Sequence, residues 1–235
     1  GGAGIQEMID RVDRDADATE RQVWEAFGAF CQAEGITTAS APGIGVPVPS
    51  AELAVETGAE AQWLAEYGRF ADLIVLGRGR DAATPALDTL EAALLDTGRP
   101  LLLTPLGVPA APPEIVVIAW KDAPAAARAV AAAMPFIEQA KRVVILSVSE
   151  DAETPDTSGE RLARALHWHN PRIERRLLTA TWQPAVEQLL AEAATLQAGL
   201  LVMGGYGHSR LREAVFGGFT QHVLRAASLP VLMAH

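Results

Sequence analysis

Beyond residue 113 the chain alternates short apolar runs with helix-length amphipathic segments, and this alternation limits the possible folds more than any other feature. The apolar runs are too short for helices and predict strands at 114–120, 142–148, 173–178, 200–204 and 230–234. The segments between them predict helices at 124–139, 161–169 and 183–197, with a fourth after residue 217. Strands that alternate with helices predict a parallel sheet with right-handed crossovers and a helix layer on each face.

The first part of the chain alternates in the same way, but less cleanly. Its patterns predict a helix at 5–34 that ends at Gly35, a loop at 37–50, a strand at 52–57, a helix at 59–70, a strand at 71–77, a helix at 86–97 and a strand at 100–104. A stretch with three prolines and a glycine, residues 107–113, follows as a linker.

Two strand sequences recur at a nearly constant offset. ADLIVLG at 71–77 resembles AGLLVMG at 198–204, an offset of 127, and the strand starts Pro100 and Pro230 are 130 apart. Two copies of one module, 1–107 and 114–235, are the simplest explanation. Subtracting the offset from Glu114 puts the opening strand of the first copy before residue 1, so we expect this copy to lack an N-terminal strand-helix-strand.

Charge and cysteine content disfavour several classes of partner. The net charge is -10 and the pI is about 5.0, so a basic footprint for nucleic acid or for an anionic membrane surface is not expected. Cys31 is the single cysteine, which excludes an internal disulfide and a cysteine metal cage and favours a reducing compartment. All apolar runs are strand-sized, so we expect no membrane span, and a cytoplasmic location is the default. No bound metal is expected, because no set of ligands for Mg²⁺ is apparent.

Glycines cluster where the fourth strand of the second copy ends and the next helix begins. Gly204, Gly207 and Gly217 follow the spacing G, two residues, G, nine residues, G. Glycines allow close approach of a backbone, and the free N–H groups of a helix start can hold an anion such as phosphate. For the pair Gly217 and Gly218, phosphate binding and close packing of a helix start on the sheet are both open interpretations.

Together with the repeat, this spacing resembles the tandem universal stress proteins. The phrases MGGYGHS at 203–209 and LPVLMAH at 229–235 carry the resemblance most specifically. It implies an α/β fold of two doubly wound parallel-sheet domains of the adenine nucleotide alpha hydrolase-like type, the first of them N-terminally incomplete. The implied strand order is 3-2-1-4-5, with a ligand crevice between strands 1 and 4.

The resemblance further implies ATP or a related adenine nucleotide in the second domain and no nucleotide in the first. The implied adenine side is lined by Ala119, Trp120 and Val148, and the implied ribose and phosphate side by Met203, Gly204, Gly207, His208, Gly217, Gly218, Phe219 and Thr220. Two positions depart from the family pattern. Lys121 stands where an acidic residue is usual, with Asp122 one position later, and Gly218 stands where Ser or Thr is usual.

The implied function is a non-catalytic stress-response module. Two alternatives stay open: a slow nucleotide hydrolase that uses the same pocket, and a protein-interaction scaffold with a vestigial pocket. The hydrolase lacks an evident carboxylate or histidine pair to activate water. The resemblance also implies pairing of the two domains through their fifth strands, 100–104 and 230–234, or pairing in a homodimer, since apolar sheet edges need covering.

Overall fold

The computed structural model describes residues 2–39, 48–78, 85–107, 111–149, 157–179, 184–205 and 217–235. Its contacts divide the chain into two compact units, residues 1–57 and residues 58–235. None of the helices within the described ranges is both long and apolar enough to cross a bilayer.

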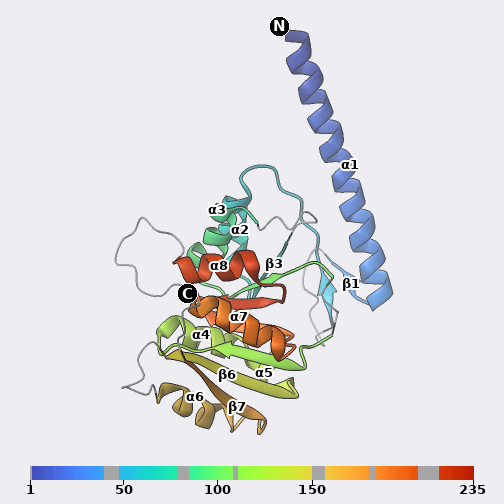
Figure 1. The fold of residues 1–235 in the computed structure, drawn as a ribbon. Helices are drawn as coiled ribbons and strands as arrows, with labels where there is room; N and C mark the ends of the chain where they lie inside the picture. Colours follow the sequence, from blue (N-terminus) through green and yellow to red (C-terminus); the bar gives the residue numbers. More distant parts are fainter. Residues whose placement is uncertain are drawn as a thin grey trace. The chain divides into compact units, whose positions relative to one another are not determined.

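The first unit contains one long helix and a small sheet (Figure 1). Helix α1 (Gly2–Glu34) confirms the helix predicted at 5–34, and it ends where Gly35 adopts a φ of +66°. Strands β1 (Thr37–Thr38) and β2 (Ser50–Ala51) pair in parallel. The strand predicted at 52–57 is wrong, because β2 has a hydrogen-bonded neighbour over two residues only and the chain after it continues outside any strand.

The second unit is built on one seven-stranded sheet in the order β3-β4-β9-β8-β5-β6-β7. The strands are β3 (Ile74–Gly77), β4 (Leu101–Thr104), β5 (Ile115–Ala119), β6 (Arg142–Ser149), β7 (Ile173–Thr179), β8 (Leu200–Gly204) and β9 (Val231–Ala234). Read from the β7 edge, the strands after residue 113 follow the order β7, β6, β5, β8 and β9, which is 3-2-1-4-5 when these five strands are numbered along the chain. They are mutually parallel, as the alternation predicts.

The helices of this unit are α2 (Glu60–Gly68), α3 (Leu87–Glu91), the π-helical segment η1 (Ala92–Asp96), α4 (Pro124–Ala132), α5 (Met134–Gln139), α6 (Ser158–Leu166), α7 (Ala185–Thr195) and α8 (Gly218–Ala226). The helix predicted at 124–139 is divided at Ala133, because Pro135 has no N–H to donate to the preceding turn. The helix predicted at 161–169 begins three residues earlier, at Ser158.

An antiparallel pairing of β4 with β9 joins the two halves of the sheet, which confirms the predicted pairing of these strands within the chain. The opposed residues are Leu101 and Met233, Leu102 and Leu232, and Leu103 and Val231. Adding 130 to positions 101, 102 and 103 gives 231, 232 and 233, which are the three partner positions in β9. Residues related by this shift therefore exchange places in the pairing, as a local two-fold axis through the middle pair requires.

The strands of both halves thus form one continuous sheet instead of two separate sheets, and the second unit spans the predicted linker. The assignment of 1–107 and 114–235 to two copies of one module stays a prediction about the sequence. The two proposed copies do not coincide with the two compact units, because β4 of the first copy and β9 of the second pair within the unit 58–235.

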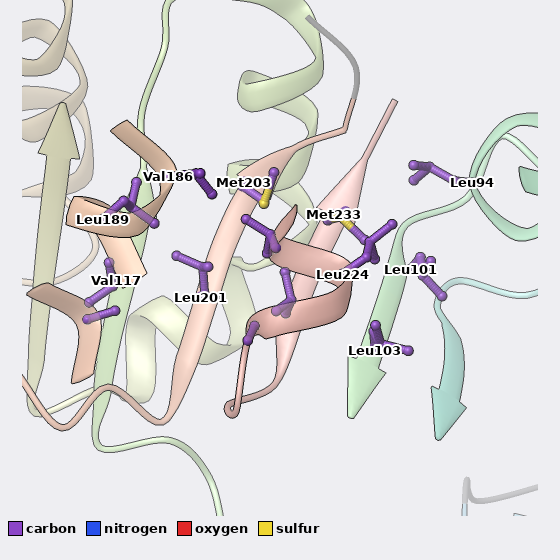
Figure 2. Packing of buried hydrophobic residues seen from close by; sticks show 14 of the residues in the cluster. Leu94, Leu101, Leu103, Val117, Val186, Leu189, Leu201, Met203, Leu224 and Met233 are labelled. Atoms are coloured by element: carbon purple, nitrogen blue, oxygen red, sulfur yellow. The ribbon is translucent and has the colours of Figure 1, made fainter. Parts of the chain in front are cut away.

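Two apolar clusters cover the two faces of this sheet. The first cluster unites side chains of η1, α7 and α8 with alternate strand residues such as Leu201 and Met203, and Figure 2 shows Leu94, Leu101 and Leu103 of the first half reaching the same cluster. The second cluster unites α4, α5 and α6 with the intervening strand residues, such as Leu200 and Val202. Because side chains alternate along a strand, each of these clusters lies on its own face.

Candidate functional site

The predicted site lies where β5 and β8, adjacent in the sheet, reach their carboxyl ends. Ala119 of β5 is in register with Met203 of β8. From β5 the chain continues to β6 on one side, whereas β8 lies on the other side. Open parallel sheets bind ligands at such a reversal of strand order, outside the carboxyl ends of the strands.

Three of the residues predicted around the nucleotide come together on one face. Ala119 packs against the first apolar cluster, to which Met203 belongs. Val148 shares a face with Leu146 of the same cluster, since it follows two residues later in β6. The Met203 side chain is buried in the core. Ala119 and the half-buried Val148 therefore offer side chains at the strand ends, whereas Met203 is buried.

Trp120 is not brought together with these residues. It packs against the second cluster, on the other face, and its indole Nε1 donates a hydrogen bond to Ser158 Oγ at 2.8 Å. The structure therefore anchors the Trp120 ring on the first turn of α6.

Packing explains the glycines at 204 and 205. A Cβ atom at Gly204 would lie 2.7 Å from the backbone nitrogen of Ala126, at the start of α4. A Cβ atom at Gly205 would lie 2.7 Å from Cδ2 of Leu94 in η1. Each glycine therefore permits a close approach, by the α4 backbone in one case and by the first half of the unit in the other.

Packing within the described part of the chain does not explain Gly217 and Gly218. A Cβ atom at either position would meet no described atom within 4 Å, and the φ of Gly217 is -60°, which any residue adopts. No described neighbour therefore requires glycine at either position through close packing. Gly217 is the N-cap of α8 and provides no side chain to cap the first amides of the helix, which are the groups that hold anions.

The remaining predicted residues of the phosphate side divide by exposure. Phe219 is 38% exposed beside the exposed Gly218, whereas Thr220 is buried with 4% exposure. Gly207 and His208 lie outside the described residues.

Of the two charged residues after β5, Asp122 contacts α6. Asp122, the acidic residue one position past the usual family site, forms an ion pair with Arg161 at 3.0 Å, and the two side chains are 61% and 73% exposed. Lys121 is exposed as well. No group of three or more His, Cys, Asp or Glu that could hold a metal is found among the residues that the structure describes.

Sequence reasoning missed Arg78, which follows β3 and reaches α8. Its Nη1 donates to the carbonyl oxygen of Ala227 at 2.5 Å, and its Nη2 donates to that of Leu224 at 2.7 Å. Partial burial lowers the pKa of this guanidinium from its ordinary value. The repeat offset of 127 could have singled out this residue, because it places Arg78 at the position of Gly205 in the second copy.

The chain resembles known proteins both in sequence and in fold. A model of the universal stress protein family matches residues 113–235. No curated protein matches the chain. A universal stress protein from Archaeoglobus fulgidus DSM 4304 superposes with a TM-score of 0.66 at 18% identity, over 93% of this chain and 77% of that chain.

Two further solved structures resemble the chain. A functionally unknown protein from Pseudomonas aeruginosa PAO1 superposes with a TM-score of 0.57 at 16% identity, over 90% of this chain and 76% of that chain. A universal stress protein in complex with cAMP matches 53% of this chain and 98% of that chain, at 23% identity and a TM-score of 0.44, a likeness too low to support an inference.

Proposed function

The chain belongs to the universal stress protein family, and from this premise we propose that it is a non-catalytic stress-response module that binds ATP or a related adenine nucleotide in its second half. The glycine pair at the start of α8 carries the proposal. Neither φ nor packing against described atoms requires glycine at 217, whereas close approach of a phosphate to the first amides of α8 does, and Gly218 keeps its N–H available there.

In this proposal the phosphates accept hydrogen bonds from the first amides of α8, at Gly218 and Phe219. The positive end of the helix dipole favours negative charge there. The hydroxyl of Thr220 is not required to meet the phosphate, because its side chain is buried. The adenine ring lies over the apolar face at Ala119 and Val148.

We also propose that the two halves are copies of one module that pair around the β4–β9 contact. The β4–β9 register supports this, because each residue of β4 and the residue 130 positions later in β9 occupy symmetric places in the pairing. This tandem arrangement restricts the nucleotide to the second half, where Gly217 and Gly218 lie.

Calorimetric titration with ATP tests the nucleotide site. We expect binding by the wild-type chain and binding weaker by about tenfold or more, ~1.4 kcal/mol, in Gly217→Val, because the added side chain obstructs anion approach. Gly77→Val is the matched control: Gly77 ends β3, and a Cβ atom there also meets nothing within 4 Å. Equal affinity of both variants would contradict the phosphate role of α8.

A protein-interaction scaffold is the second candidate, and one observation favours it. Asp122, the acidic residue nearest the position that contacts the nucleotide in binding relatives, is engaged by Arg161 of α6. A folded wild-type chain that gives no heat with ATP would support the scaffold. Phosphate release from ATP above that of Gly217→Val would instead support the slow hydrolase and contradict the non-catalytic assignment.

A further inference from the structure

Arg78 connects the first half of the sheet to the end of α8. Its backbone N–H extends the pairing of β3 and β4 by donating to the carbonyl of Thr104 at 2.9 Å. Its guanidinium then donates to the carbonyls of Leu224 and Ala227. The last carbonyls of a helix have no partner inside the helix and carry the negative end of its dipole, so a cation that bonds to two of them stabilises this end.

The contact has a counterpart related by the repeat. Residues 78 and 205 differ by 127, and residues 94 and 224 differ by 130, the two offsets of the sequence repeat. Gly205 admits the side chain of Leu94, and Arg78 meets the backbone of Leu224. Gly205 and Arg78 thus occupy equivalent positions in the two copies. Gly205 of the second copy leaves room for Leu94 of the first, and Arg78 of the first copy donates to the Leu224 carbonyl of the second.

The start of α8 needs such support. Gly217 at its N-cap supplies no side-chain cap, and Gly218 at the first helical position is less favourable in a helix than any residue except proline. The helix is only nine residues long, so anchoring at one end affects the order of the other. Its buried side chains are Thr220 in the first turn and Val223 and Leu224 in the second half, and the two bonds from Arg78 reach Leu224 and the C-cap residue Ala227.

We propose that Arg78 is a positioning residue for the nucleotide site: by bonding to the last carbonyls of α8, it holds the helix whose first amides bind phosphate. This inference rests on the proposed nucleotide function. Arg78, which follows β3 in the first copy, thereby serves the phosphate site of the second copy through α8.

The test uses the full chain and three variants, Arg78→Ala, Arg78→Lys and Arg99→Ala. Arg99 is the matched control, because its Nε and Nη2 also donate to a main-chain carbonyl, that of Arg69, at 3.0 and 2.7 Å, and that carbonyl follows α2 instead of α8. Two quantities are measured: the ratio of the dissociation constants for adenosine and ATP, and the hydrogen exchange of the amides at 221–223 in the ligand-free chain, the first in α8 that donate within the helix.

We expect Arg78→Ala to weaken ATP about fivefold more than adenosine, the effect of a partly buried cation at a helix end. Arg78→Lys should restore part of the difference, and Arg99→Ala should leave it unchanged. Exchange at 221–223 should be faster in Arg78→Ala and unchanged in Arg99→Ala.

Equal weakening of ATP and adenosine would overturn the inference, because loss of general stability affects both ligands alike. Unchanged exchange at 221–223 in Arg78→Ala would overturn it as well. If the wild-type chain binds neither ligand, the nucleotide function fails by itself, and the exchange measurement still decides whether Arg78 holds α8. Should Arg78→Ala not fold, Arg78→Lys and Arg78→Gln carry the same comparison.

Discussion

Gly204 lies so close to the first turn of α4 that a side chain does not fit. A Cβ atom would be 2.7 Å from the nitrogen and 3.1 Å from the Cα of Ala126, and 3.0 Å from the carbonyl carbon of Ala125. These are backbone atoms that cannot rotate away. We therefore expect Gly204→Ala to lower the free energy of unfolding by about 1–3 kcal/mol, the usual cost of overpacking, in urea denaturation.

Gly77→Ala is the control for this substitution, since it occupies the corresponding place at the end of β3 and its Cβ atom enters open space. Its unfolding free energy should stay within about 0.5 kcal/mol of the wild type. Equal loss in the two variants would mean that the glycine requirement at 204 comes from the strand end and not from α4.

These glycines also show how far the sequence alone could predict the site. The spacing of Gly204, Gly207 and Gly217 is readable in one dimension. Which glycine admits a helix and which faces open space is not, because the deciding atoms belong to α4 and η1. The buried state of Thr220 and the reach of Arg78 to Leu224 depend on the same long-range contacts.

The pairing of β6 with β7 includes an ion pair that should respond to acid. Arg142 Nε and Nη2 donate to the Glu174 carboxylate at 2.8 and 2.7 Å, and this hydrogen bonding lowers the pKa of Glu174. A carboxylate with a lowered folded-state pKa contributes stability above its unfolded value, about 4.3, and loses that contribution as the pH falls through the folded value.

We expect the carboxyl carbon of Glu174 to titrate below its ordinary midpoint in NMR, and Arg142→Gln to move that midpoint upward. Arg99→Gln also removes one positive charge, from a guanidinium that donates to the carbonyl of Arg69, and it should leave the titration midpoint of Glu174 unchanged. A Glu174 midpoint that Arg142→Gln does not raise would show that the pair does not form in solution.

The sequence pattern predicted strands correctly where the segment pairs with a neighbouring strand in the folded chain. All five strands predicted after residue 113 are present, because each pairs with a neighbour in the sheet. The alternation at 52–57 gives no strand, since pattern alone supplies no second strand to bond with. Pro135 divides a helix whose apolar spacing continues across it.

One continuous sheet makes residues 58–235 a single compact unit although the sequence repeats within it. The β4–β9 pairing joins the halves, and Leu103 of β4 belongs to the same apolar cluster as Leu201 and Met233. The repeat and the apolar edges predict this pairing. The shared core depends on side chains such as Leu94, whose approach to Gly205 no sequence offset reveals.

A cavity in β4 should therefore destabilise both halves together. Leu103 is 1% exposed, and we expect Leu103→Ala to lower the unfolding free energy by about 2–5 kcal/mol. In native-state hydrogen exchange, the slowest amides of β4 and those of β8 should lose protection by the same free energy, since both exchange through one cooperative opening. Leu87→Ala, at a side chain that is 50% exposed, should change neither set by more than about 0.5 kcal/mol. Faster exchange in β4 with unchanged protection in β8 would show instead that the two halves unfold separately, with the β4–β9 pairing breaking first.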